Sequence, residues 1–216
     1  MIFADRLIVL NTTKLGETKV VLHTLSREWG RRGFVVSVGR KASMSLFLPL
    51  NILSAEITEN PRSSLWNASR LQAEYPLNGI RSNIRKNTMT LFMSEVLYRA
   101  VKEGAREDGL FEWCERSILT LDALEGYYSN YHIRFLLELA VQMGFAPTAE
   151  DLAPFAGEYL SVLQRFVSAD FAESMLIPLT GEARNRIAEA LLRYISYHSE
   201  SALNVQSLSV LRELYG

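Results

Sequence analysis

The sequence predicts an α+β protein in which a small five-stranded β-barrel is followed by an all-α helical domain. Two observations support this fold class. Short apolar runs rich in β-branched residues, separated by polar turns, occupy the chain up to residue 76, and from residue 84 onward apolar residues recur at helical spacing. The chain has 216 residues, of which 48% are apolar, so it can form compact cores. We expect one domain over residues 1–77 and a second over residues 78–216.

The two parts also differ in charge. Residues 1–77 carry ten Lys and Arg against six Asp and Glu, whereas the remainder carries thirteen against eighteen. The formal net charge of −1 is thus the sum of a basic module and an acidic one. This asymmetry indicates two surfaces with different partners. Ordinary variation in surface charge is the alternative interpretation.

Five segments of the first part have the composition of strands. Residues 7–10 are apolar and end in the polar residues 11–13, which indicates a strand entering a loop. Residues 26–30 form a short polar connection with a glycine for positive φ, so we expect a hairpin there. The predicted strands are 7–10, 19–25, 31–38, a strand within 46–57 that Pro49 places at an edge or interrupts, and 66–76. Five short strands with too little apolar surface for two stacked sheets fit a Greek-key barrel of the OB type.

The second part predicts helices, with one region of low regularity. Asn130 and Thr180 are expected to cap helices at their N-termini. The predicted helices are residues 82–101, 110–124, 131–143, 157–167, one that begins after Thr180, and 207–214. The least regular region is residues 148–178.

Cations are concentrated in the first part, around the predicted hairpin. In OB barrels one exposed face and its loops hold single strands through phosphate contacts and base stacking. The predicted phosphate-contacting residues are Lys14, Lys19, Arg27, Arg31, Arg32, Arg40 and Lys41. Phe34 shares a strand face with other apolar residues and is expected in the core, whereas Trp29 is compatible with either a core position or base stacking.

Several functional classes lack their signals in the sequence. The chain has no apolar stretch of the roughly 20 residues that cross a bilayer and no secretion signal, so we expect no membrane association and a cytoplasmic location at the nucleoid. Cys114, the single cysteine, lies in an apolar pattern and is expected to be a core thiol. We find no phosphate-cradling glycine loop, nucleophile elbow or closely spaced metal ligands, so we expect neither an enzyme nor a bound metal.

Short motifs spread over nearly the whole chain resemble those of the RecO family of bacterial recombination-repair mediators. They are residues 15–19 (LGETK), 27–30 (REWG), 39–41 (GRK), 92–97 (FMSEVL), 144–147 (GFAP) and 207–214 (SLSVLREL). The resemblance implies an OB fold followed by a helical domain. It also implies binding of single- and double-stranded DNA, annealing of complementary strands, binding of the C-terminal tail of single-strand binding protein, and association with RecR to help load recombinase onto coated strands.

The resemblance carries two further expectations. Many members of the family hold zinc through four cysteines, but residues 148–178, which take the place of that region, contain no cysteine, so we expect neither metal nor other cofactor. The tail of single-strand binding protein is acidic and ends in an apolar residue, and its receptor therefore needs an apolar pocket with a cation at the rim. Arg99, Lys102 and Arg134 are candidate rim residues, unless they are ordinary helix-surface cations. The alternative to a DNA mediator is a non-catalytic scaffold whose small barrel binds peptides or RNA.

Overall fold

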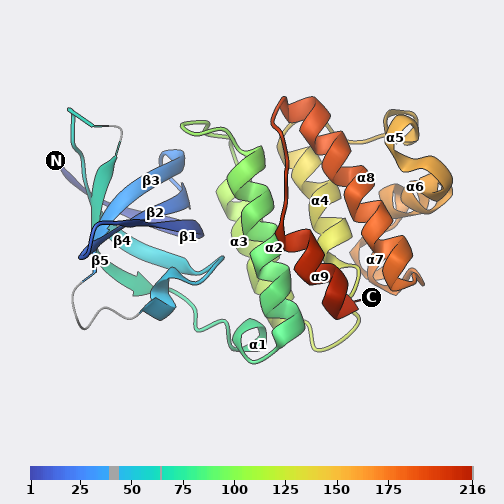
Figure 1. The fold of residues 1–216 in the computed structure, drawn as a ribbon, viewed down its shortest axis with the longest axis horizontal. Helices are drawn as coiled ribbons and strands as arrows, with labels where there is room; N and C mark the ends of the chain where they lie inside the picture. The colour runs from blue at the N-terminus through green and yellow to red at the C-terminus, as the bar shows by residue number, and fades with distance from the viewer. Residues whose placement is uncertain (39–43, 64, 216) are drawn as a thin grey trace.

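The computed structural model describes residues 1–38, 44–63 and 65–215. Its first part is a closed five-stranded barrel, and the rest of the described chain is helical (Figure 1). The strands are β1 (Ile2–Leu15), β2 (Lys19–Ser26), β3 (Gly30–Ser37), β4 (Ile52–Thr58) and β5 (Trp66–Ala73), with a 3₁₀ turn η1 (Met44–Phe47) before β4. This architecture confirms the predicted fold class.

The strand order around the barrel is β1-β2-β3-β5-β4, with β4 returning to β1. Only the short contact between β3 and β5, at Phe34 and Trp66, is parallel; the other pairs are antiparallel. These are the connections of an OB-type barrel. The hairpin predicted at residues 26–30 is confirmed, because Ser26 pairs with Gly30 across the β2–β3 turn.

Alternation along β1 distributes its side chains between two cores. Leu7 and Val9 belong to the barrel interior, together with Phe34 of β3, whereas Ile8 and Leu10 pack with the helices. Side chains of successive strand residues point to opposite faces, so one strand can serve both cores. The sequence interpretation of residues 11–13 as a loop is wrong: β1 continues to Leu15, with a bulge between Val9 and Asn11.

Nine helices occupy the described part of the chain after the barrel, together with one 3₁₀ turn. They are α1 (Asn78–Arg81), α2 (Ile84–Ala100), α3 (Leu110–Ala123), α4 (Tyr131–Gln142), α5 (Ala149–Ala156), η2 (Gly157–Tyr159), α6 (Leu160–Ser168), α7 (Phe171–Leu176), α8 (Gly181–Ser199) and α9 (Ser207–Tyr215). None of them combines the length and the apolar composition that crossing a membrane requires.

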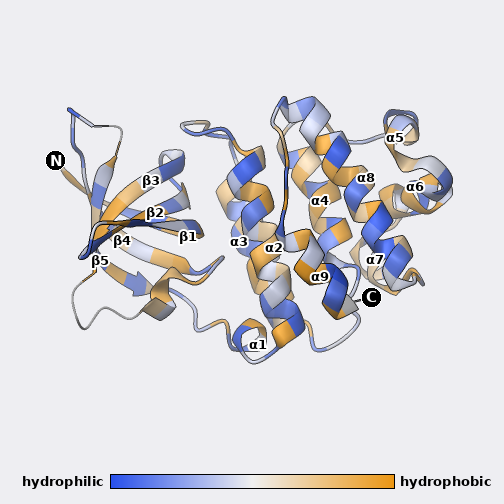
Figure 2. Cartoon of the chain, in the orientation of Figure 1, coloured by the Kyte–Doolittle hydropathy of each residue, from blue (hydrophilic) through white to orange (hydrophobic). Residues whose placement is uncertain are grey.

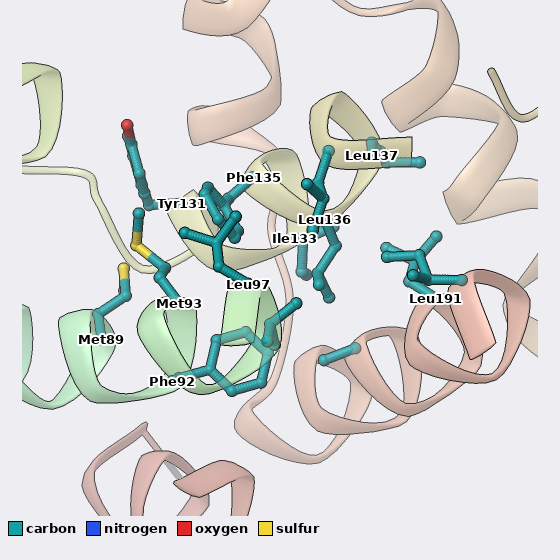
Figure 3. Close-up of a cluster of buried hydrophobic side chains, with 14 of the residues drawn as sticks. Met89, Phe92, Met93, Leu97, Tyr131, Ile133, Phe135, Leu136, Leu137 and Leu191 are labelled. Atoms are coloured by element: carbon teal, nitrogen blue, oxygen red, sulfur yellow. The ribbon is translucent and has the colours of Figure 1, made fainter. Parts of the chain in front are cut away.

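Helices α2, α4 and α8 build the centre of the helical core. Met89, Phe92 and Leu97 of α2 belong to one interior cluster with Leu136 of α4 and Leu191 of α8 (Figure 3), and all are nearly or fully buried. Hydrophilic residues are visible on α7, α8 and α9 (Figure 2), and those of α3 include Glu112 and Glu115, which contact the barrel. Burial of large apolar side chains stabilises this arrangement by about 1.5–3 kcal/mol for each one.

The two predicted N-terminal caps, Thr180 and Asn130, have different outcomes in the structure. The Thr180 hydroxyl accepts a hydrogen bond from the Ala183 N–H at 3.1 Å, which confirms it as the cap of α8. Asn130 stands at the start of α4, but its side chain does not cap that helix. It donates to the carbonyl oxygens of Ser174 and Ile177 at 3.0 and 2.8 Å and accepts from Arg184 Nε at 3.1 Å. The predicted cap is therefore wrong, because a tertiary contact uses the amide.

The region 148–178 is helical without any cysteine. α5 and α7 each begin with a capping box, formed by Thr148 with Asp151 and by Asp170 with Glu173. The helix predicted over residues 157–167 appears as η2 followed by α6, while α5 and α7 were not predicted. Among the described residues no group of three or more His, Cys, Asp or Glu side chains could hold a metal ion.

Candidate nucleic-acid interface

Lys14 and Lys19 lie together at the tip of the β1–β2 hairpin. Leu15 pairs with Lys19 and Lys14 with Val20, and Gly16 has a φ of 71° in the tight turn between the strands. Both lysine side chains are exposed, and no ion pair of either is found within the described ranges. The tip therefore presents two cations to an incoming polyanion.

The end of β3 lies beside this tip. Lys19 pairs with Ser37, and the Val38 N–H donates to the Thr18 carbonyl oxygen at 2.7 Å. Arg40 and Lys41, the remaining predicted cations after β3 in the sequence, fall outside the described residues.

Arg27 and Arg31 lie at the opposite end of β2 and β3, against the helices. Arg27 Nε donates to Glu112 of α3 at 3.0 Å. The Arg31 guanidinium lies over the Tyr98 ring, 4.5 Å from its centroid, and 3.7 Å from a carboxylate oxygen of Glu103. The backbone of Arg31 also bonds to the 104–105 turn. Both arginines thus join the barrel to the helices.

Arg32 lies over a row of aromatic rings near the same end. Its guanidinium is 3.7 Å from the centroid of Trp66, which meets Trp29 edge to face at 5.2 Å, and Trp29 meets Phe3 in turn at 5.6 Å. Trp29 is partly buried in this row. Phe34 is fully buried in the barrel interior, which confirms its predicted core position.

The predicted cations therefore separate into two groups. β2 runs eight residues from Lys19 to Ser26, so the hairpin tip and the β2–β3 turn are about 23 Å apart at 3.3 Å per residue. Lys14 and Lys19 occupy the open end, whereas Arg27 and Arg31 are engaged with helices α2 and α3 and the connection between them. Alternation gives the strand face of each cation, but it does not reveal that a second domain covers part of that face.

A polar junction near Arg27 was not anticipated from the sequence. Arg6 of β1 forms a two-pronged ion pair with Glu115 of α3 and a second one with Glu74 at 3.2 Å, and the Tyr75 hydroxyl also bonds to Glu115 at 3.2 Å. The hydrogen bonds to Glu115 raise the pKa of Arg6 above its ordinary value. These residues come from separate segments, so no local motif could have identified them.

His23 lies on the covered part of the β2–β3 face. Its ring meets Tyr98 edge to face at 5.1 Å, and its Nε2 is 3.0 Å from the Thr13 hydroxyl. Burial, and then the positive charge of Arg31, lower the pKa of His23 below its ordinary value. At neutral pH a neutral His23 therefore stands between the two groups of cations.

The three predicted rim residues for a peptide tail do not share a pocket. Arg99 is paired with Glu95 at 2.9 Å and lines a cavity of about 450 Å³ between β1, η1 and α2. Lys102, 3.9 Å from Glu200, lines a different cavity of about 190 Å³. Arg134 is bonded to Glu138 at 2.6 Å and to the Ala169 carbonyl oxygen at 2.9 Å.

Cys114 offers no reactive thiol. It is fully buried in the helical core, and desolvation raises its pKa well above the ordinary value. The thiolate is the reactive form, so this environment keeps the group inert.

The chain is similar in sequence to a known protein family. Residues 81–152 match the family model described as "Recombination protein O C terminal". The chain is 28% identical to a DNA repair protein RecO from Phocaeicola vulgatus and 29% identical to one from Bacteroides fragilis; each alignment covers 96% of this chain and 97% of the relative. A DNA repair protein RecO from Flavobacterium johnsoniae is 23% identical with the same coverage.

Proposed function

Because the chain belongs to the RecO family, we propose that it is a DNA repair and recombination mediator that binds single- and double-stranded DNA and anneals complementary strands. One observation carries the DNA-binding part of this proposal: the tip of an OB-type barrel presents Lys14 and Lys19 to solvent with no carboxylate partner among the described residues. Cations in this setting neutralise phosphates and release condensed counterions. The mechanism requires no catalytic residue.

The proposed mechanism follows from electrostatics. Two complementary strands repel each other through their phosphates, and a cationic surface that holds one strand reduces this repulsion while its bases stay free to pair. Arg40 and Lys41, which the sequence predicts as phosphate contacts, belong to the proposed DNA-binding set as well. Arg32 and Trp29 are proposed as a further contact at the other end of the strands.

Annealing of complementary oligonucleotides, followed by fluorescence energy transfer, tests this function. We expect the variant Lys14→Ala/Lys19→Ala to anneal more slowly than wild type. Arg116→Ala/Arg165→Ala is the matched control, because it removes two exposed cations from α3 and α6 and should anneal at the wild-type rate. Equal rates for wild type and the hairpin variant would contradict the role of the hairpin, and turnover of DNA strands would contradict a non-catalytic function.

We also propose that the helical part receives RecR and the tail of single-strand binding protein, and that the protein thereby helps to load recombinase. The cavity beside Arg99 supports a tail site there, because Leu91 and Phe47 supply apolar lining and Arg99 supplies a cation at the edge. Binding of a synthetic acidic peptide with an apolar C-terminal residue should weaken in Arg99→Ala and persist in Arg116→Ala. Binding unchanged in Arg99→Ala would remove this cavity as the tail site.

A further inference from the structure

Among the described residues, the second half of β1 has one edge without a paired strand. β4 pairs with β1 only from Ile2 to Ile8, whereas β2 pairs with it as far as Leu15. In the parts of the chain that the structure describes, residues 11–15 therefore have a neighbouring strand on one side only. A strand edge of this kind exposes backbone N–H and C=O groups that can pair with another strand.

The hydrogen-bond pattern identifies which backbone groups face outward. The Arg27 N–H donates to the Arg6 carbonyl oxygen at 3.0 Å, so the odd-numbered residues of β2 face β1. Their partners Asn11, Thr13 and Leu15 consequently face β2. Thr12 and Lys14 face away from it. The Thr12 N–H is bonded to the side chain of Asn11 at 2.8 Å, so within the described ranges the N–H of Lys14 is the outward donor of this edge.

A cavity adjoins the same edge. Asn11 and Thr12 form one side of the 450 Å³ cavity, and Phe47 of η1 and Leu91 of α2 contribute apolar lining. Leu91 is 41% exposed, and the buried hydroxyl of Thr12 has no hydrogen-bond partner in the described structure. A strand added to the edge would direct alternate side chains toward this cavity, since side chains alternate along a strand.

The charges at the edge favour an acidic occupant. Lys14 and Lys19 are exposed, and with the single nearby carboxylate of Glu17 they leave a net positive charge at the tip. Glu95 inside the cavity is already satisfied: burial opposes its ionisation, but hydrogen bonds from Ser207, Gln206 and Arg99 lower its pKa below the ordinary value. A lysine on an exposed edge also opposes pairing with a second copy of the same edge, because the two cations would meet.

We infer that the edge of β1 at residues 12–14 binds an extended acidic segment of a partner protein by β-strand addition, with an apolar side chain of that segment in the cavity beside Leu91. The bound segment pairs through its backbone and needs no free C-terminus. The inference does not depend on DNA binding, but it rests on the acidic-peptide site proposed above for the same cavity and adds backbone pairing with β1 to it.

Amide hydrogen exchange measured by NMR gives the first test. The probe is a short peptide of alternating Asp and Val, blocked at both ends, with the same peptide methylated on alternate backbone nitrogens as a control. We expect the Lys14 amide to exchange rapidly in the free protein and slowly with the first peptide only. Protection of Lys14 in the free protein would overturn the inference, because the edge would already be paired. Equal protection by the methylated peptide would also overturn it.

A pair of substitutions gives the second test. Lys14→Ala removes the charge and keeps the N–H, whereas Lys14→Pro removes both, and proline is tolerated where a strand N–H faces outward. We expect the Asp-Val peptide to bind about five- to tenfold more weakly to Lys14→Pro than to Lys14→Ala, as for the loss of one hydrogen bond. Equal affinities would contradict strand addition. Protection of Lys14 by a single-stranded oligonucleotide but not by the peptide would assign the edge to nucleic acid instead.

Discussion

At the scale of single residues, Gly30 of the barrel lies against the chain that follows α2. A Cβ atom on Gly30 would lie 2.0 Å from the Ala105 carbonyl oxygen, and the residue has a φ of 66°. Gly16 has a similar φ of 71°, but nothing lies within 4 Å of its Cβ position. The two glycines therefore separate the cost of backbone strain from the cost of a steric contact.

We predict that Gly30→Ala lowers the free energy of unfolding by about 3 kcal/mol and Gly16→Ala by about 1 kcal/mol. Both variants place alanine in a left-handed backbone conformation, which costs free energy. Only Gly30→Ala must also displace the 104–105 turn. Urea denaturation measures the two values. Equal losses would show that Ala105 does not constrain Gly30.

His132 predicts a pH dependence of stability. It is fully buried beside Phe92, and burial, followed by the positive charge of Arg184, lowers its pKa from 6.5 to about 3. As the pH falls, His132 therefore becomes protonated near pH 6.5 in the unfolded chain but only near pH 3 in the folded chain. The stabilising contribution is complete above pH 6.5 and is lost progressively as the pH falls toward 3.

Replacing His132 should reduce this pH dependence. Between pH 7.5 and pH 5 we expect the wild type to lose about 2 kcal/mol more stability than His132→Phe, which cannot bind a proton. Denaturant titrations at the two pH values measure the difference. Parallel losses in both proteins would mean that His132 is protonated in the folded state.

At the scale of elements, the sequence predicted the long amphipathic helices well. α2, α3 and α4 end within a few residues of the expected limits because their apolar residues recur at helical spacing over three or more turns. α5 and α7 were not predicted because their eight and six residues are too few to show a helical period of apolar residues. α5 also contains Pro154. β1 was predicted too short because its second half is polar and exposed.

The same reasoning explains the partial prediction of the candidate site. The sequence singles out Lys14 and Lys19 as cations near strand ends, and their contact with DNA stays a prediction. The contacts of Arg27 and Arg31 with the helices could not be predicted, because Glu112 and Tyr98 lie far away in the sequence. The cavity beside Thr12 likewise brings together β1, η1, α2 and the start of α9, and no single segment signals it.

The contacts of Asn130 and Arg184 predict how region 148–178, which contains no cysteine, is held in place. Asn130→Ala leaves the carbonyl oxygens of Ser174 and Ile177 without their donor and the buried Arg184 without one acceptor. We expect a loss of about 2–3 kcal/mol in unfolding free energy and faster hydrogen exchange in α7 than in α3. A chelator should leave the wild-type melting temperature unchanged. Unaltered exchange in α7 would contradict this role of Asn130.

At the scale of the whole molecule, the barrel and the helices share a core. Six residues of the segment 1–77 are buried among helical side chains and not in the barrel interior: Ile8, Leu10, Leu25, Leu50, Ile52 and Leu77. Residues 1–77 cut from the chain would expose this surface. We therefore predict that the isolated segment melts at a lower temperature than the full chain and binds a hydrophobic dye.

Substitution of the exposed surface provides the control for this prediction. Ile8→Thr/Leu25→Thr/Ile52→Thr in the isolated segment should reduce dye binding, because it makes the uncovered face polar without altering the interior cluster around Leu7 and Phe34. A wild-type segment that melts at the temperature of the full chain would mean that residues 1–77 are an independent domain.

The salt dependence of single-strand affinity tests the central claim most directly, namely that the hairpin tip of the barrel binds phosphates. Each phosphate contact contributes about −0.7 to the slope of log affinity against log salt concentration for a single strand. We predict a steep negative slope for wild type, a slope flatter by up to about 1.4 for Lys14→Ala/Lys19→Ala, and a wild-type slope for Arg116→Ala/Arg165→Ala. Identical slopes for wild type and the hairpin variant, or equal flattening in both variants, would contradict the claim.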